Sequence, residues 1–127
     1  MTRAKSDVAQ LATQLRYAQN AVTSVNYGNG WYEDDRTFGD DIALLHSEVS
    51  EALEAYRDHG YEDATNIFAV THGQVIPKPE GVGSELADVF IRLLDTCHRR
   101  GIDLAAEFER KVAYNATRGH RHGGKRL

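Results

Sequence analysis

The stretch from Asp40 to Gly60 constrains the fold most, because its apolar residues follow a helical spacing. Asp40 or Asp41 can serve as the N-cap residue, and Gly60 suits the position that ends a helix. The predicted helix carries one strip of apolar side chains that recur at three- and four-residue steps: Ile42, Leu45, Val49, Ala52, Leu53 and Tyr56. We call this the apolar strip and expect it to face the protein core.

A second strip lies beside the apolar strip on the same predicted helix. At roughly 100° per residue, Glu48 and Glu51 share it with Leu44 and Ala55. We call it the mixed strip; it does not lie opposite the apolar strip, where a solvated face is expected. Burying two ionised carboxylates one turn apart is costly unless cations neutralise them. The pattern therefore predicts two buried contacts and gives a first indication of a bound metal.

The rest of the chain predicts three further helices within a single domain, residues 1–127. These helices run from Ser6 to about Asn26, from Glu85 to about Arg100 and from Leu104 to about Thr117, with Ser6, Ser84 and Asp103 as N-caps. Four amphipathic helices without a convincing sheet predict an all-α four-helix bundle. One small bundle covers only one strip of each helix, so we also expect oligomerisation to complete it.

The segment between the second and third predicted helices, residues 61–83, is the least regular part of the chain. Residues 66–70 and 74–76 can form a small β-hairpin, and the two prolines in 77–79 favour an extended strut. We expect an irregular or hairpin insert that serves as a lid or a partner contact. Residues 119–127 are polar and rich in Gly and His, and they predict a basic tail.

Charge and composition exclude several classes of protein. Residues 110–127 contain six Arg or Lys and no acidic residue, so the preceding part has a net charge near −10. An acidic body argues against a nucleic-acid partner and favours an anionic small substrate bound through cations. The chain has one cysteine, no apolar run of membrane-spanning length and no signal-peptide pattern. We therefore expect a cytoplasmic protein without a membrane partner.

Two acidic pairs form the candidate reaction centre. Glu48-x-x-Glu51 lies on the second predicted helix, and Glu85-x-x-Asp88 lies near the start of the third. Residues three apart share a helix face, so two facing pairs can bring four carboxylates together. Such hard oxygen ligands suit Mg²⁺ or Mn²⁺, with substrate phosphates as further ligands. For either pair alone, a solvated helix face is the alternative.

Two further groups of residues suit a nucleotide. Lys111, Asn115 and Arg118 share one face of the fourth predicted helix, where two cations and an amide suit phosphate oxygens. A salt-bridged helix end is the alternative there. Trp31 and Asn26, in and near the turn after the first helix, can stack on and bind a base at a subunit interface. For Trp31 the alternative is simple packing.

Glu48-x-x-Glu51 followed by Glu85-x-x-Asp88 resembles the signature of the MazG-like all-α nucleoside triphosphate pyrophosphohydrolases. The resemblance covers about residues 42–125 and includes Lys78-Pro79-Glu80-Gly81, residues 85–95, Lys111-x-x-Tyr114-Asn115-x-x-Arg118 and Arg121-His122-Gly123-Gly124-Lys125. One position departs from the pattern: Ser47 stands where the family usually has a further glutamate.

The resemblance implies a Mg²⁺-dependent hydrolase that cleaves a (deoxy)nucleoside triphosphate to the monophosphate and pyrophosphate, in nucleotide-pool housekeeping. It implies that Glu48, Glu51, Glu85 and Asp88 hold one or more Mg²⁺ ions, and that Glu48 or Glu51 orients the attacking water. We expect a homodimer or homotetramer. Two alternatives stay open: a phosphoribosyl-ATP pyrophosphohydrolase, and a catalytically silent helical binding module in which Ser47 marks lost turnover.

Overall fold

The structure is a computed structural model that describes residues 3–62, 68–69, 73 and 76–119. It contains four helices and two short strands: α1 (Arg3–Gly28), α2 (Phe38–His59), β1 (Phe68–Ala69), β2 (Lys78–Pro79), α3 (Val82–Arg99) and α4 (Leu104–Ala116). The prediction of an all-α chain with four helices is confirmed. Within the described residues, no helix combines the length and the apolar character needed to cross a membrane.

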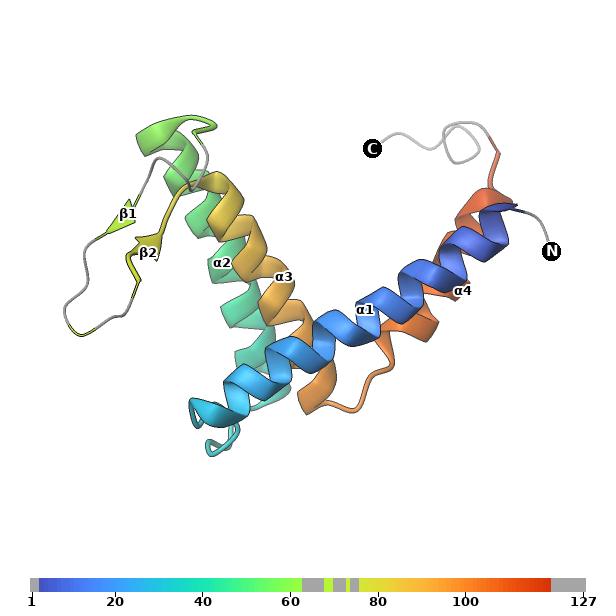
Figure 1. Cartoon of the computed structure of the whole chain (residues 1–127), viewed down its shortest axis with the longest axis horizontal. Helices are drawn as coiled ribbons and strands as arrows, with labels where there is room; N and C mark the ends of the chain where they lie inside the picture. The colour runs from blue at the N-terminus through green and yellow to red at the C-terminus, as the bar shows by residue number, and fades with distance from the viewer. Residues whose placement is uncertain (1–2, 63–67, 70–72, 74–75, 120–127) are drawn as a thin grey trace.

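The four helices form two arms that meet at an angle (Figure 1). In one arm α2 packs along α3; in the other, α4 packs along α1. The arms meet where α1 crosses the C-terminal part of α3, and the Gln19 side-chain amide donates to the Leu94 carbonyl there at 3.2 Å. A single chain therefore does not close into one four-helix bundle, because α4 packs mainly on α1 and leaves α2 uncovered on its outer side.

The small core follows from this arrangement. Leu94 and Cys97 of α3 are buried near the crossing with α1, and Thr23 of α1 is buried as well. Ala12 on α1 and Ala105 on α4 are also buried, and such small side chains let paired helices approach closely. Few large apolar residues are fully enclosed, so much apolar surface stays available for another contact.

The apolar strip of α2 does not face the core along its whole length, contrary to the prediction. Val49, Leu53 and Tyr56 are 52%, 50% and 44% exposed, whereas Ala52 is buried. The reason is that α2 has one main helix partner, α3, and α3 contacts the side that carries Glu48. Within the strip's outer part, the Tyr56 ring lies 4.8 Å from that of Tyr61, and Val49 and Leu53 remain half exposed.

A capping box fixes the start of α2 three residues earlier than predicted. Thr37 is the N-cap; its side chain accepts from the Asp40 amide at 3.1 Å, and Asp40 accepts from the Thr37 amide at 2.8 Å. The prediction of Asp40 or Asp41 as the N-cap was wrong, because both lie inside the first turn. The predicted end is confirmed: Gly60 follows His59 with a φ of 64°, which glycine adopts without strain.

The other predicted caps have mixed outcomes. Asp103 caps α4 as expected, and it accepts from the Ala106 amide at 3.1 Å. Ser6 lies inside α1, which already begins at Arg3. Ser84 lies inside α3; the helix starts after Gly81, and the Ser84 hydroxyl donates to the Pro79 carbonyl at 3.1 Å. Ser84 therefore ties α3 to the preceding strand.

The insert contains a two-stranded antiparallel pairing, with Phe68 opposite Pro79 and Ala69 opposite Lys78. The first predicted strand, residues 66–70, contains β1. The second strand was predicted at residues 74–76 but lies at Lys78–Pro79, within the stretch that the prolines keep extended. Residues 63–67, 70–72 and 74–75 and most of the predicted tail, residues 120–127, lie outside the described residues.

Candidate metal centre and adjoining pocket

Three carboxylates from two helices converge between α2 and α3. Glu48 of α2 and Glu85 and Asp88 of α3 each offer one oxygen, and these oxygens lie within 4.8 Å of one another. All three residues are partly buried. We call this group the acidic centre. It contains one residue of the first predicted pair and both residues of the second, as the i, i+3 spacing on facing helices required.

Two ion pairs set the register that brings the acidic centre together. Near the start of α2, Asp41 is 1% exposed and accepts from Arg100 Nε at 2.7 Å, just after α3 ends. Glu48 lies two turns after Asp41 on α2. Its partner Arg92 lies on α3, two turns before Arg100. The helices therefore run antiparallel, and a shift of one turn would separate both pairs.

Glu48 is held by Arg92 from within the same chain. Arg92 Nη2 lies 2.6 Å and Nε 3.2 Å from Glu48 Oε1, and the two side chains are 15% and 12% exposed. Both nitrogens donate to one oxygen, so Oε2 stays outside this contact. The guanidinium carbon of Arg92 also lies 5.3 Å from the centre of the Trp31 ring. Arg92 thus links the acidic centre to the aromatic turn after α1.

The other two carboxylates of the acidic centre, Glu85 and Asp88, lie close to negative charges that the neighbouring cations do not fully offset. Burial, and then the charges of Asp88, Glu51 and Glu48, raise the pKa of Glu85 above its ordinary value. Burial and the charge of Glu48 likewise raise the pKa of Asp88, with Lys78 and Arg92 opposing the rise. Partly buried, mutually repelling carboxylates are the donor set that a hard divalent cation such as Mg²⁺ stabilises. The residues present therefore fit the predicted metal.

Glu51, the fourth predicted ligand, lies beside the acidic centre but outside its closest group. Its side chain is exposed and lines a hollow of about 280 Å³ together with Glu54, Asp58, Glu80 and Glu85. Its charge contributes to the raised pKa of Glu85, so the two carboxyl groups are near neighbours. Glu51 is thus placed at the solvent side of the centre, where a water molecule has access.

A pocket of about 300 Å³ opens directly from the acidic centre, and we call it the adjoining pocket. Glu48 and Asp88 form one wall, and Asn26, Trp31, Ile91, Arg92 and Asp95 form the remainder. The structure therefore brings Asn26 and Trp31, the two predicted base-binding residues, next to two of the predicted metal ligands, Glu48 and Asp88. Trp31 is 43% exposed, so part of its ring is free of packing.

Asp95 is a pocket residue to which the sequence analysis gave no role. It is 2% exposed, and its Oδ1 accepts from Asn26 Nδ2 at 2.9 Å and from the Tyr32 hydroxyl at 2.5 Å. Burial and this contact with Asp95 raise the pKa of Tyr32 to about 12, so Tyr32 stays a neutral donor. Asp95 and Arg92 lie seven and four residues after Asp88, and this helical spacing was the available signal.

The predicted phosphate-binding residues lie away from the acidic centre within one chain. Lys111, Asn115 and Arg118 are exposed on or just after α4, which packs on α1 in the other arm (Figure 1). Lys111 Nζ and the Arg118 guanidinium lie 5.7 and 5.9 Å from the Tyr114 ring centre. Tyr114 itself is 58% exposed, so these contacts lie at the surface.

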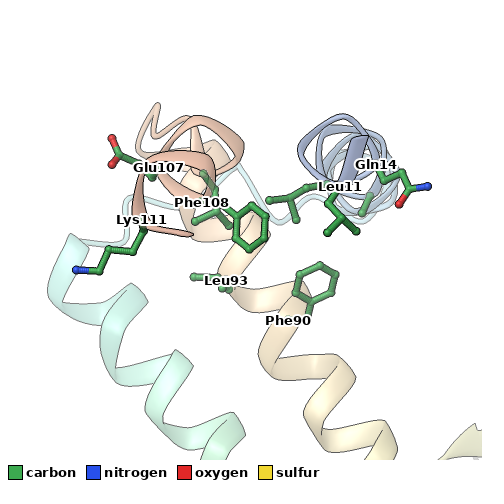
Figure 2. A pocket seen from close by; sticks show the side chains of 10 residues that line it. Leu11, Gln14, Phe90, Leu93, Glu107, Phe108 and Lys111 are labelled. Atoms are coloured by element: carbon green, nitrogen blue, oxygen red, sulfur yellow. The ribbon is translucent and has the colours of Figure 1, made fainter. Parts of the chain in front are cut away.

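An apolar groove of about 640 Å³ lies where α1, α3 and α4 come together. Figure 2 shows Phe90 of α3 and Phe108 of α4 directed into the same space, with Leu11 of α1 beside them. Lys111 stands at the edge of this groove rather than near the carboxylates (Figure 2). The groove is almost without polar lining, which suits packing by other apolar side chains rather than phosphate.

Comparison with known proteins gives no match to a family model, a curated protein or a solved structure.

Proposed function

We propose that this chain is a Mg²⁺-dependent nucleotide pyrophosphohydrolase of the MazG-like kind, which converts a (deoxy)nucleoside triphosphate to the monophosphate and pyrophosphate. One observation carries the proposal: three carboxylates from two helices lie within 4.8 Å of one another, beside a pocket lined by Trp31 and Asn26. The resemblance of the two acidic pairs to that family's signature points the same way.

In this proposal, different residues of the chain bind the metal, orient the water and hold the base. Glu48, Glu85 and Asp88 would hold the metal, which when bound supplies charge neutralisation for the triphosphate and a more acidic water. Glu51, exposed beside Glu85, is placed to orient an attacking water from the solvent side. The adjoining pocket shares Glu48 and Asp88 with the acidic centre, so a base in the pocket directs its phosphates toward the carboxylates.

We also propose that the active form is a homodimer or homotetramer in which a second copy supplies the α4 cations. Lys111 and Arg118 lie on the other arm from the acidic centre of their own chain. The exposed residues Val49 and Leu53 on α2, and the apolar groove, give each chain apolar surface for another copy. The acidic α2–α3 arm and the cationic end of α4 have complementary charge.

The decisive experiment measures pyrophosphate release from a panel of ribo- and deoxyribonucleoside triphosphates, with Mg²⁺ and with EDTA. The proposal predicts monophosphate plus pyrophosphate, lost in EDTA. Release of single phosphate would contradict it. Turnover of phosphoribosyl-ATP alone would favour that rival hydrolase, and no release from any substrate would favour a silent binding module.

A further inference from the structure

The floor of the adjoining pocket holds a buried carboxylate with an unused oxygen. Asp95 Oδ1 accepts two hydrogen bonds, from Asn26 and from Tyr32, whereas no described residue donates to Oδ2. The side chain is 98% enclosed, yet it lines the pocket together with Trp31. Among the described residues, the fully enclosed side-chain polar atoms without a partner are Thr96 Oγ1 and Arg99 Nε, so Asp95 Oδ2 is accessible from the pocket. Asp95 Oδ2 is therefore available to accept a hydrogen bond from a molecule in the pocket.

Asp95 also fixes the orientation of its neighbour Asn26. A carboxylate only accepts hydrogen bonds, so the Asn26 atom that faces it must be the amide nitrogen. This turns the Asn26 carbonyl oxygen away from Asp95, as a second acceptor among the pocket residues. Tyr32, locked as a donor to the same carboxylate, keeps Asp95 in place from the other side.

The remaining wall of the pocket selects the kind of donor. Arg92 lines the pocket but is already paired with Glu48 at 2.6 Å, so Asp88 and Asp95 leave the pocket wall acidic, which favours a ligand group that donates hydrogen bonds and disfavours an anionic ring. The guanidinium groups of Arg92 and Arg36 lie 5.3 and 5.9 Å from the Trp31 ring centre, and the part of Trp31 that stays exposed suits contact with a flat ring. The volume of about 300 Å³ lies at the lower end of ligand pockets. A neutral, planar ring with an amino group meets all of these conditions.

We propose that Asp95, with Asn26 held by it, is the specificity-determining residue of the adjoining pocket and accepts a hydrogen bond from the exocyclic amino group of a nucleobase. The chain then prefers triphosphates of cytosine, adenine or guanine over those of uracil, thymine or hypoxanthine. A keto base offers its ring N–H only beside a carbonyl oxygen, which the anionic Asp95 repels. This inference rests on the proposed function.

Two matched substrate pairs test the inference on the wild-type protein. dCTP and dUTP differ by one amino group, as do ATP and ITP, so kcat/KM within each pair isolates its effect. We expect the amino-bearing member to be favoured by about tenfold or more, because the keto member places a carbonyl oxygen where Asp95 accepts a hydrogen bond. Equal or reversed preference in both pairs would overturn the inference while pyrophosphohydrolase activity stood.

A binding measurement separates this inference from the proposed activity. If no triphosphate is hydrolysed, the proposed function fails, and titration with dCMP and dUMP in the absence of Mg²⁺ still tests Asp95. The inference expects dCMP to bind more tightly by about tenfold. Equal affinity, tighter binding of dUMP or no binding of either nucleotide would contradict it.

The substitution Asp95→Asn provides the residue-level test, because it keeps the shape and adds a donor. We expect the dCMP-to-dUMP affinity ratio to fall toward one, since asparagine can also donate to the uracil carbonyl. Asp7→Asn is the matched control: Asp7 is exposed on α1, and the ratio should stay at the wild-type value. A wild-type ratio in Asp95→Asn would overturn the inference, and the wild-type pairs decide the question if that variant does not fold.

Discussion

Arg92 is the residue through which the acidic centre and the adjoining pocket depend on each other. It pairs with Glu48 at 2.6 Å and stands over Trp31, so it contributes to both sites. Among the described residues Glu85 and Asp88 have no comparable partner, and burial and then the like charges around them raise the pKa of both. Arg92 therefore occupies only Oε1 of Glu48, and the other Glu48 oxygen, with Glu85 and Asp88, is left for a cation.

Removing Arg92 should strongly destabilise the metal-free protein. Arg92→Ala leaves Glu48 as an enclosed charge without its partner, a change that typically costs about 3–5 kcal/mol. Mg²⁺ should restore part of that loss, because it neutralises the same carboxylate. Urea unfolding with and without Mg²⁺ measures both effects. Arg110→Ala is the control, since its pair with Glu107 is exposed and should be worth less than about 1 kcal/mol.

If Arg92→Ala lowered the free energy of unfolding no more than Arg110→Ala does, the Glu48–Arg92 ion pair would contribute no more than a solvent-exposed pair. A loss that Mg²⁺ did not reduce would argue that Glu48 does not bind the ion.

Glu85→Gln should raise stability and lower activity together. Burial and then the charges of its neighbours raise the pKa of Glu85 and so disfavour its ionised form; a neutral side chain of the same shape relieves both costs at pH 7. As a metal ligand, its loss should reduce turnover by more than the about 10–100-fold that outer-shell partners cost. Thermal melts and pyrophosphate release measure the two effects.

Glu54→Gln is the matched control for Glu85→Gln, because Glu54 lines the outer hollow but lies outside the acidic centre. It should keep wild-type turnover. Wild-type turnover in Glu85→Gln itself would remove Glu85 from the metal site.

At the scale of elements, helical periodicity was sufficient to predict which segments form helices but not which of their sides meet. The spacing within residues 40–60 placed α2 and its two strips. The apolar strip was expected in the core, yet α3 packs on the side that carries Glu48, because the Asp41–Arg100 and Glu48–Arg92 pairs select that side. Such pairs join residues far apart in the chain, so spacing alone could not predict them.

In the candidate site, too, some residues were predictable from their local spacing, and others depend on contacts between distant parts of the chain. Glu85 and Asp88 were predictable because an i, i+3 pair is a local pattern. The role of Asp95 was not, since it depends on Asn26 and Tyr32, which reach it only where α1 crosses α3. The start of α2 differs from the prediction for a local reason: Thr37 and Asp40 form a capping box, a pattern within four residues, and it places the N-cap before both aspartates.

The contact between α2 and α3 should respond to pH and to Mg²⁺ in a defined direction. Glu85 and Asp88 have raised pKa values, so the folded chain holds their protons more tightly than the unfolded chain does. The stability they contribute is therefore full at low pH and is lost as pH rises through their raised values. In EDTA, this contribution should make stability fall across that range, relative to Glu85→Gln.

Mg²⁺ should reverse the loss at neutral pH. A ligand that binds only the folded state, at a free concentration of about 100 times its Kd, adds about 2.7 kcal/mol to the free energy of unfolding. For a small domain each kcal/mol shifts Tm by about 4–8 °C. The Mg²⁺-induced shift should shrink below the raised pKa values, where protons replace the ion. A shift that persisted unchanged in acid, or in Glu85→Gln, would place the ion elsewhere.

At the scale of the whole molecule, the two arms explain why one chain is an incomplete enzyme under our proposal. The acidic centre and the adjoining pocket belong to the α2–α3 arm and its crossing with α1, and the α4 cations belong to the other arm (Figure 1). The outer part of the apolar strip and the apolar groove remain open to contact. A second copy could cover this apolar surface. The same copy could place its Lys111 and Arg118 beside the acidic centre of the first.

Mixing two defective variants tests that arrangement directly. Glu85→Gln removes the acidic centre, and the double change Lys111→Ala with Arg118→Ala removes the cations. If the two parts come from different copies, a mixed dimer regains one intact site, and random mixing restores about one quarter of wild-type activity. The variants are refolded together, their mass is measured by light scattering, and pyrophosphate release is compared with each variant refolded alone. Mixed oligomers that stayed inactive would mean that the cations act within their own chain, and wild-type activity of the double variant refolded alone would mean that they have no role.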